Sequence, residues 1–339
     1  MKALVTGASG FVGFHVAKLL QEQGVSVRAF VREKSDVSLL REMDVELVLG
    51  DIRDADGVNR AVKGCGQVYH VAADYRLWVS DPRQMYETNV QGTVNVMRAA
   101  LATDVEKVVY TSSAGTLVAR NKGCDPFHEE TPVRLTDMVG HYKRSKFLAE
   151  REACRFAGQG LPVVIVNPTT PVGALDRKPT PTGKIIVDFL NGRMPAFIET
   201  GLNFVDVEDV ASGHWLAACH GRVGEKYILG SRNISLSQFF QILAQASGLK
   251  APRVKLPYLP VLCAAYADEA LSTWIFRKAP RIPVAGVRMA KEHMYFDCSK
   301  AHTELHMGQA DIEKAAERAV NWYYSEGYAG SRLFGGHHG

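Results

Sequence analysis

Tyr142 and Lys146 are the two side chains whose types and spacing most directly suggest chemistry. Residues four positions apart on a helix lie on one face, so the phenol and the ammonium would be neighbours. Free tyrosine titrates near pH 10, and lowering its pKa by about 3 units requires roughly 4 kcal/mol of preferential phenolate stabilisation. A nearby positive charge supplies such stabilisation. The pair therefore predicts a tyrosine that acts as a general acid or base, with a plain surface pair as the alternative.

Two hydroxyl groups stand at the end of the apolar run Lys107–Ser113, which is predicted to be a strand. Neighbouring side chains of a strand point to opposite faces, so Ser112 and Ser113 cannot both serve the tyrosine. Tyr142 follows at the start of the next predicted helix, His141–Ala157. A hydroxyl donor and an acidified phenol would together stabilise a developing alkoxide.

A glycine-rich loop, Gly7-Ala-Ser-Gly10-Phe-Val-Gly13, lies between the predicted strand Lys2–Thr6 and a predicted apolar helix, Phe14–Gln23. This context indicates a dinucleotide site. The first glycine permits a tight turn, the second allows close approach of a pyrophosphate, and the third allows helix–strand packing. The helix N-terminus offers free N–H groups and a positive dipole end. The cofactor-binding residues predicted in this loop are Gly7, Ser9, Gly10, Phe11, Val12 and Gly13.

Strands and helices then alternate as a parallel sheet requires. Further strands are expected at Val25–Arg32, Val45–Asp51, Gln67–Ala73, Lys107–Ser113 and Val163–Asn167, and helices at Asp54–Val62, Pro82–Ala102 and His141–Ala157. The pattern predicts an α/β fold with a Rossmann-type doubly wound parallel sheet, whose ligands bind at the carboxyl ends of the strands. Residues at those ends, and therefore candidates for binding, are Asp51, Ala72, Ala73, Ser112, Ser113 and Asn167.

The end of the second strand bears on the choice of cofactor. NAD-binding sheets usually end this strand with an acidic residue that binds the ribose 2′-hydroxyl. This chain has Arg32 there, and no carboxylate before Glu33. An arginine suits a 2′-phosphate, which favours NADP(H) over NAD(H). A solvated Arg32 at the sheet edge is the alternative.

The 339 residues suggest one large domain or two intimately joined domains. An NAD(P)-binding domain is expected at 1–168, a smaller α/β substrate-capping region at 169–330, and a tail at 331–339. Some elements of the second part can return to the first sheet. Predicted elements there are a strand at Lys226–Leu229 and helices at Leu236–Ala246, capped by Ser235, and Ile312–Tyr324.

Composition narrows the function classes. A hydrophobic content of 46% and a charged content of 22% are ordinary for a globular protein, and a net charge of +4 does not argue for nucleic acid. Six scattered cysteines without a Cys-x-x-Cys pair suit a reducing compartment and indicate neither a zinc site nor disulfides. No stretch is long and apolar enough to span a membrane, and we therefore expect a cytoplasmic protein. The cysteine pattern leads us to expect no metal.

Taken together, these motifs resemble the extended short-chain dehydrogenase/reductase family, also called NAD-dependent epimerases and dehydratases, over almost the whole chain. The matching positions are Gly7, Gly10, Gly13, Asp51, Ile52, Asn89, Ser113, Tyr142, Lys146, Asn167 and Pro168. The resemblance implies that Tyr142 is the acid/base and that Lys146 lowers its pKa and holds the nicotinamide ribose. It further implies that Ser113 binds the substrate oxygen and that Asn89 supports a water relay. Asp51 and Ile52 would contact adenine, and Asn167 and Pro168 would flank the nicotinamide.

Within that family the chain is similar to hopanoid-associated sugar epimerases and to dihydroflavonol reductases. The runs that carry the similarity are 70–78, 140–150, 167–173, 178–187 and 203–211 for the former, and 27–32 and 111–116 for the latter. The resemblance implies an NADP(H)-dependent oxidoreductase that transfers hydride between nicotinamide and a carbonyl or carbinol, with a role in hopanoid lipid metabolism as one option. A sugar epimerase with retained cofactor and a transient keto intermediate is the alternative. Leu202 stands where nucleotide-sugar epimerases carry a diphosphate-binding arginine, which argues against a nucleotide-sugar substrate.

The substrate is expected to be a small molecule, and a lipid- or sugar-linked one remains open. Candidate substrate residues are Asp74, Tyr75, Trp78, Asn167, Thr170 and Asp206. The stretch from Arg253 to Arg281 mixes aromatic, aliphatic and basic residues, which suits either peripheral contact with a lipid surface or packing on the capping region. Val90, Val94, Met97, Phe147 and Leu148 suit either a homodimer interface or the sheet-facing core.

Overall fold

The computed structural model describes residues 1–120, 125–276 and 278–330. The tail expected at 331–339 and Arg277 of the basic stretch lie outside the described residues.

The centre of the molecule is a seven-stranded parallel sheet with the strand order β10-β6-β5-β4-β1-β2-β3. Its strands are β1 (Lys2–Thr6), β2 (Ser26–Val31), β3 (Val45–Leu49), β4 (Gln67–His70), β5 (Lys107–Thr111), β6 (Val163–Pro168) and β10 (Lys226–Leu229). The predicted doubly wound fold is confirmed. Several predicted strands extend too far at their carboxyl ends, because the residues that follow leave the ladder and turn over the edge of the sheet.

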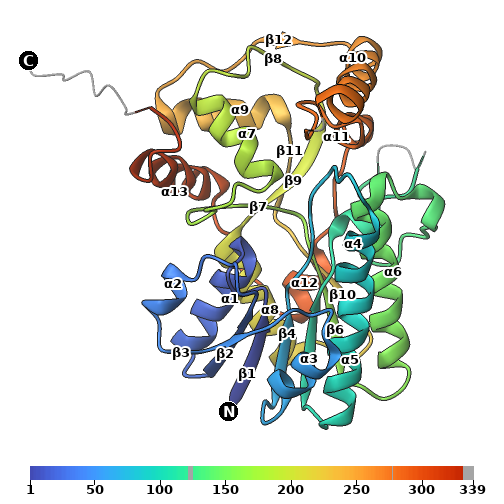
Figure 1. Ribbon diagram of the computed structural model, residues 1–339. Helices are drawn as coiled ribbons and strands as arrows, with labels where there is room; N and C mark the ends of the chain where they lie inside the picture. The colour runs from blue at the N-terminus through green and yellow to red at the C-terminus, as the bar shows by residue number, and fades with distance from the viewer. Residues whose placement is uncertain (121–124, 277, 331–339) are drawn as a thin grey trace, which may run out of the picture.

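Helices cover both faces of this sheet (Figure 1). The helices α1 (Phe11–Glu22), α8 (Val207–His220) and α12 (Ser299–Glu304) pack on one face, and α3 (Ala55–Val62), α5 (Gly92–Ala102) and α6 (Gly140–Ala157) pack on the other. Strands buried on both faces need continuous apolar runs, and all six residues of β6 are buried. The short helix α2 (Ser38–Arg41) lies between β2 and β3 in the chain.

The predicted helix Pro82–Ala102 is confirmed, and it changes its winding on the way. It begins as α4 (Arg83–Tyr86), widens into a π-helical turn at Glu87–Gln91, and continues as α5. Such wide turns frequently mark functional positions. Asn89 lies in the wide turn, which the sequence did not predict.

A second layer from the later part of the chain lies over the carboxyl edge of the sheet, at the end opposite the N-terminus (Figure 1). It contains β7 (Thr170–Val172), β9 (Gly201–Asp206) and β11 (Arg232–Ser235) in one small sheet, and β8 (Ala196–Phe197) with β12 (Val254–Lys255) in another. Its helices are α7 (Pro181–Leu190), α9 (Leu236–Ser247), α10 (Tyr258–Leu271), α11 (Val284–Met289) and α13 (Ile312–Ser325). Ser235 caps α9 as predicted, within a capping box completed by Gln238.

The positions considered for a dimer interface belong largely to the interior of the monomer. Met97 is fully buried, Phe147 is 8% exposed, and Val90 and Val94 pack against the core on the α3, α5 and α6 side of the sheet. Their burial in the monomer therefore favours the sheet-facing core over a dimer interface. Across the ranges 1–120, 125–276 and 278–330, no helix has the length and apolarity that a membrane crossing requires.

A buried ion pair joins the two halves of the chain. Glu150 Oε1 on α6 lies 2.5 Å from Lys226 Nζ on β10. Burial would raise the pKa of Glu150, but Lys226 and hydrogen bonds from Ser112 and Asn167 hold it below its usual value. The pair therefore fixes β10, which comes from the second half, against the helix that carries Tyr142 and Lys146.

We expect Lys226→Met to lower the free energy of unfolding by about 3 kcal/mol at pH 7, because the Glu150 carboxylate stays buried without a cation. The folded pKa of Glu150 is lowered, so the stabilisation from this pair is present above the ordinary carboxyl pKa and is lost as pH falls below it. Urea denaturation at pH 7 and pH 4 should show a difference between variant and wild type that narrows at low pH. Lys18→Met, which breaks the exposed Lys18–Glu22 pair, should cost only about 0.5 kcal/mol. Equal losses in the two variants would contradict the assigned role.

Candidate functional site

The Ser113 and Tyr142 side chains meet at the carboxyl edge of the sheet. Ser113 follows β5 and caps the short 3₁₀ turn Ala114–Leu117, where its Oγ accepts a hydrogen bond from Gly115 N at 3.1 Å. Tyr142 is partly buried in the first turn of α6, and the Ser113 side chain hydrogen-bonds its phenol. The edge thus holds two hydroxyl groups that can act on one substrate oxygen.

Ser112 points elsewhere. Its Oγ donates to Glu150 Oε2 at 2.5 Å, and the same carboxylate oxygen accepts from Thr116 Oγ1 and Asn167 Nδ2, each at 2.9 Å. Ser112 therefore belongs to the buried network under the site, and Ser113 faces the tyrosine.

Lys146 is buried one turn beyond Tyr142. Its Nζ donates to Thr111 O at 2.6 Å and lies 4.7 Å from the centre of the Tyr110 ring. Burial lowers the pKa of Lys146 to about 7, although Glu150 acts in the opposite direction. A cation in this dry setting interacts strongly with any negative charge that develops nearby.

Tyr142 does not show the lowered pKa that the sequence predicts. Burial raises the pKa of its phenol, the Ser113 hydrogen bond lowers it, and Asp74 raises it further. Desolvation of the phenolate is the largest of these effects, and the Nζ of Lys146 is directed to Thr111 O. In the chain by itself the tyrosine is therefore held as a neutral proton donor.

Asn89 connects the loop after β4 to the helix of the site. Its Oδ1 accepts from Asp74 N at 2.7 Å, and its Nδ2 donates to Asp74 O and to Ser145 Oγ, each at 2.9 Å. Ser145 Oγ in turn donates to Tyr142 O at 2.8 Å. The wide π turn thus brings the Asn89 amide to both partners, and its part in a water relay stays a prediction.

The glycine loop forms a backbone cradle at the start of α1. Gly7 has φ +72°, and a Cβ there would lie 2.7 Å from Ala72 Cα. A Cβ on Gly13 would lie 2.1 Å from Gly7 O, so neither position admits a side chain. The N-cap of α1 is Gly10, and no side chain caps the first turn, which leaves its N–H groups available to an anion. This geometry fits a dinucleotide pyrophosphate, with Ser9 exposed and Phe11 and Val12 partly buried at the loop.

On the expected adenosine side, Arg32 and Asp51 have different surroundings. Arg32 follows β2, is exposed, and has no side-chain hydrogen bond or ion pair within the described ranges. Asp51 is held by Arg53, with Nε–Oδ1 at 3.0 Å and Nη2–Oδ2 at 2.8 Å, and these bonds lower the pKa of Asp51. Ile52 is buried beside it. Arg32 is therefore the free cation at this end, and Asp51 is committed to a neighbour.

On the expected nicotinamide side, Asn167 is completely buried at the end of β6, next to the buried Pro168. Its Nδ2 donates to Ser113 O at 3.1 Å, but its Oδ1 has no partner among the residues that the structure describes. An orphaned buried acceptor calls for an explanation, and a donor group of a bound molecule would satisfy it. Ala72 and Ala73 line the same edge after β4, where Ala72 N donates to Thr6 Oγ1 at 3.2 Å.

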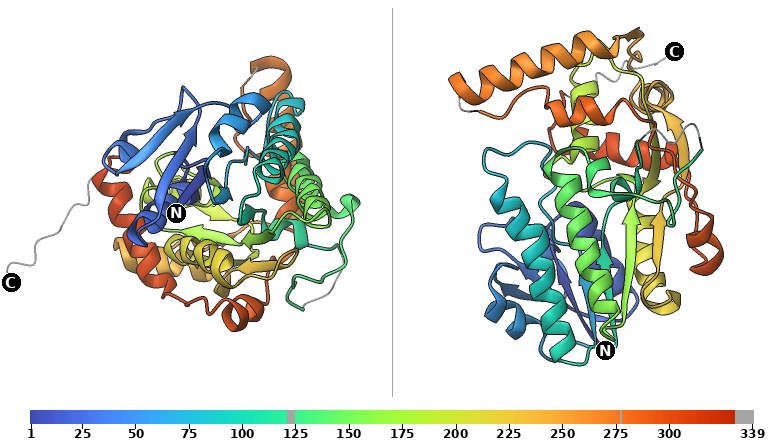
Figure 2. Two further views of the ribbon diagram at one scale, coloured as in Figure 1. Left: turned by 90° about the horizontal axis from the view of Figure 1, so that it is seen from below. Right: turned by 90° about the vertical axis from the view of Figure 1, so that its right-hand side faces the viewer.

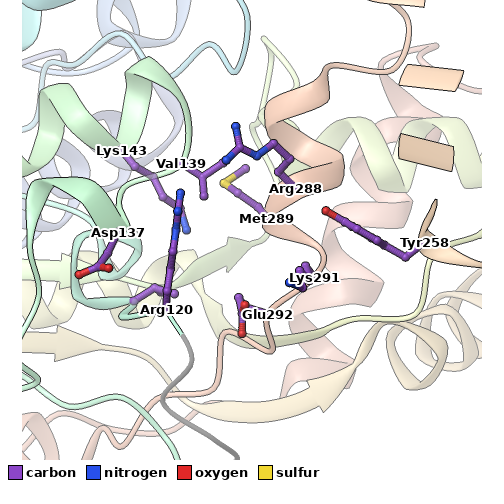
Figure 3. Close-up of a pocket in the computed structure, with 10 residues that line it drawn as sticks. Arg120, Asp137, Val139, Lys143, Tyr258, Arg288, Met289, Lys291 and Glu292 are labelled. Carbon is purple, nitrogen blue, oxygen red and sulfur yellow. The ribbon is translucent and has the colours of Figure 1, made fainter. Parts of the chain in front are cut away.

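Two cavities lie beside this edge. One, of about 280 Å³, is lined by Val118, Arg120, Asp137, Val139, Lys143, Tyr258, Arg288, Met289, Lys291 and Glu292 (Figure 3). The other, of about 220 Å³, is lined by residues that include Arg76, Trp78, His141 and Glu269. Val139 and Arg288 line both. Trp78, one of the candidate substrate residues, therefore lines a cavity.

The other candidate substrate residues lie outside these linings. Asp74 pairs with Arg76 at 2.5 Å, and Tyr75 OH donates to Lys178 O at 3.3 Å, so their loop packs on the capping layer. Thr170 lies on β7, and Asp206 caps α8 and pairs with Arg318. The structure therefore does not bring Thr170 and Asp206 to either cavity.

Sequence reasoning missed the basic lining of the larger cavity. Lys143 carried one usable signal, its place directly after Tyr142 on the predicted helix. Arg288 and Lys291 carried none, because only the fold brings residues this distant in the chain to the site.

The chain is similar to known proteins over almost its whole length. The model of the NAD dependent epimerase/dehydratase family matches residues 3–230. A Synechocystis sp. protein provisionally named dihydroflavonol 4-reductase is 42% identical over 328 residues, which are 96% of this chain and 95% of that protein. Sterol demethylase protein B of Methylococcus capsulatus is 32% identical over 328 residues, with coverage of 96% and 99%. The crystal structure of gox2253 superposes with a TM-score of 0.86 at 45% identity, covering 97% of this chain and 99% of that one.

Proposed function

The chain belongs to the NAD dependent epimerase/dehydratase family of NAD(P)-dependent enzymes, and from this premise we propose that it is an NADP(H)-dependent oxidoreductase acting on a carbonyl or the matching carbinol. The observation that carries the proposal is the meeting of the Ser113 and Tyr142 hydroxyls beside the buried Lys146 ammonium. The free backbone cradle at α1 supports dinucleotide binding on the same edge of the sheet.

The roles follow from where each group lies. A bound nicotinamide would supply the hydride to the carbonyl carbon, or accept it from the carbinol carbon. In reduction, Tyr142 donates its proton to the substrate oxygen and becomes a phenolate, and in oxidation it removes that proton. Ser113 donates a hydrogen bond to the same oxygen as negative charge develops on it. Lys146, buried one turn away on α6, stabilises the phenolate by its charge.

Epimerisation on the same residues is the second candidate, and the family description favours it. An epimerase returns the hydride to the substrate and shows no net cofactor change, whereas a reductase consumes one NADPH for each product. Leu202 favours the reductase, because this apolar residue of β9 bridges to Met294 where a cation would be needed for a diphosphate. Mass spectrometry of the co-purifying cofactor, followed by an NADPH-consumption screen of carbonyl compounds, separates the two. Retained oxidised cofactor without NADPH consumption would favour the epimerase.

We expect Tyr142→Phe to reduce turnover by about 10²- to 10⁴-fold, because the proton donor is lost while the ring remains. NADPH affinity, measured by fluorescence titration, should be unchanged, since the glycine loop is untouched. Ser113→Ala should reduce turnover as well, whereas Phe11→Leu, in the cofactor loop, should act mainly on cofactor affinity. Wild-type turnover in Tyr142→Phe would remove this residue from the acid/base role.

The preference for NADP(H) is the finer part of the proposal, and the free Arg32 supports it. A guanidinium pairs well with a phosphate through charge-assisted hydrogen bonds. Asp51 is held by Arg53 and so does not repel a phosphate as an unpaired carboxylate would.

Arg32→Ala should weaken NADPH binding about tenfold, the scale of one charged hydrogen bond, and leave NADH binding unchanged. Parallel fluorescence titrations with the two cofactors measure this directly. Lys34→Ala, which removes an exposed charge two residues away, is the matched control and should match wild type. Tighter binding of NADH than NADPH by the wild-type protein would defeat the preference.

For the substrate, we propose a lipid-linked or polycyclic molecule of the hopanoid kind, reached through peripheral contact with a membrane surface. Support comes from α10, which extends along the outside of the capping layer (Figure 2), and from the name of the relative sterol demethylase protein B. On α10, Leu259 is 69%, Tyr266 54% and Leu271 49% exposed. Its carboxylates turn inward, where Asp268 accepts from Ile282 N and Glu269 from Val284 N.

Exposed cations precede and follow α10 in the chain, namely Arg253, Lys278 and Arg281, and also Lys255, which pairs with Glu199. Apolar side chains beside cations suit an anionic lipid surface. A homodimer remains a prediction that this arrangement neither requires nor opposes.

The protein should co-float with vesicles of phosphatidylcholine and phosphatidylglycerol, and less with phosphatidylcholine alone. Leu259→Ser combined with Tyr266→Ser should abolish flotation, because the apolar contact is lost. Leu49→Ser is the control, since Leu49 is 63% exposed on β3, outside the capping layer. Absence of wild-type protein from the floated fraction would mean that α10 does not bind lipid.

A further inference from the structure

We propose that the 280 Å³ cavity beside Lys143 is an anion-binding subsite that takes a carboxylate or phosphoryl group carried by the substrate. The inference rests on the proposed function, because it assigns a substrate class to the same active site.

The cavity has an excess of positive charge. Four cations line it, Arg120, Lys143, Arg288 and Lys291, against two carboxylates, Asp137 and Glu292. Asp137 Oδ2 accepts from Arg134 N at 2.8 Å, which holds one of these carboxylates to its own turn. None of the four cations has an ion pair with a carboxylate of the described chain. The lining therefore offers hydrogen-bond donors and positive charge to an anion.

Lys143 differs from an ordinary surface lysine because it is buried. It is 6% exposed, and its Nζ contacts Met294 Sδ at 3.4 Å as its only hydrogen-bond partner in the ranges described. Burial lowers the pKa of Lys143 to about 8, and no carboxylate counters this effect. A buried ammonium without a counter-ion is unfavourable, and an anion in the cavity would supply the missing charge.

The other lining groups reach the cavity from different elements. Lys143 comes from α6, Arg288 and Met289 from α11, and Tyr258 from the start of α10. In Figure 3 the Tyr258 hydroxyl points from α10 toward the side chains of α6 and α11. The subsite therefore lies between the sheet layer and the capping layer. A substrate bound there can contact residues of both layers.

Lys143 connects the cavity to the reacting edge. A Cβ on Gly115 would lie 3.1 Å from Lys143 Cε and 3.3 Å from Ser113 Oγ, so the lysine stem and the serine hydroxyl border the same position. Lys143 also directly follows Tyr142 in the chain. An anionic group of a substrate whose oxygen lies between Ser113 and Tyr142 therefore has Lys143 on the neighbouring side of the site.

Calorimetric titration with inorganic phosphate and with succinate, at saturating NADP⁺ to occupy the glycine loop, tests the subsite itself. Wild type should bind at least one probe, and Lys143→Met should bind it about tenfold more weakly, as loss of a charged hydrogen bond predicts. Lys143→Arg should retain binding, and Arg288→Met, on a separate element, should also weaken it. Arg151→Met removes an exposed charge from the same helix outside the cavity and should match wild type.

Steady-state assays with matched pairs distinguish the two anion types. Dihydroxyacetone phosphate against dihydroxyacetone tests a phosphoryl group, and 4-oxopentanoate against its methyl ester tests a carboxylate. Wild type should prefer the charged member of one pair in kcat/KM, and Lys143→Met should lose that preference.

Two results would overturn the proposal: no binding of either probe by wild type, or equal binding by wild type and Lys143→Met. Failure to oxidise NADPH with any carbonyl would count against the proposed function alone, because the calorimetric comparison decides the subsite without turnover. Lys143→Met should also melt no lower than wild type, since it removes a buried unpaired charge, and a lower melting temperature with unchanged anion binding would assign Lys143 a structural role.

Discussion

The buried carboxylate of Glu150 is the interaction on which the site depends. One oxygen faces Lys226 of β10, and the other accepts hydrogen bonds from Ser112, Thr116 and Asn167. These partners come from the ends of β5 and β6, from the turn that Ser113 caps, and from a strand of the second half. A charge removed from water must be paired and fully hydrogen-bonded to be tolerated, so the geometry of all four segments is coupled. Ser113, Tyr142 and Lys146 are held in register through this coupling.

The same helix carries two buried lysines for which the described residues provide no ion pair. Lys143 and Lys146 are both buried on α6, and desolvation lowers the pKa of each, to about 8 and about 7. Glu150, four residues beyond Lys146, is already paired with Lys226. Buried ionisable groups with strongly shifted pKa values are concentrated at sites where a ligand or a reaction supplies the opposite charge. The two faces of α6 can thus serve different parts of one substrate complex, with the reacting oxygen near Tyr142 and an anion near Lys143.

Much of the frame could be predicted from the sequence, because its signals are local. Apolar runs separated by turn residues marked the sheet strands, and the glycine loop marked the first turn, since only glycine fits beside Ala72 and under Gly7 O. The motif around Tyr142 located the helix of the site. Two features were not predicted, for physical reasons. The π turn at Asn89 depends on partners in the loop after β4 and on α6, and α8 shares one face of the sheet with α1 and α12 through packing that only the fold sets.

By itself, then, the sequence determined the parallel sheet, the glycine cradle, and the identity of the hydroxyls and cations available for chemistry, because periodicity and fixed short spacing carry that information. Only the tertiary structure decided the pKa values of those groups and which side chains surround them. It raised the pKa of Tyr142 where the spacing to Lys146 had predicted a lower one, because burial has the largest effect on the phenol and the Lys146 ammonium is directed at Thr111 O. It also brought Arg288 and Lys291 beside Lys143 and left Asp206 capping a helix, since packing of the capping layer, and not spacing along the chain, sets which side chains share a cavity.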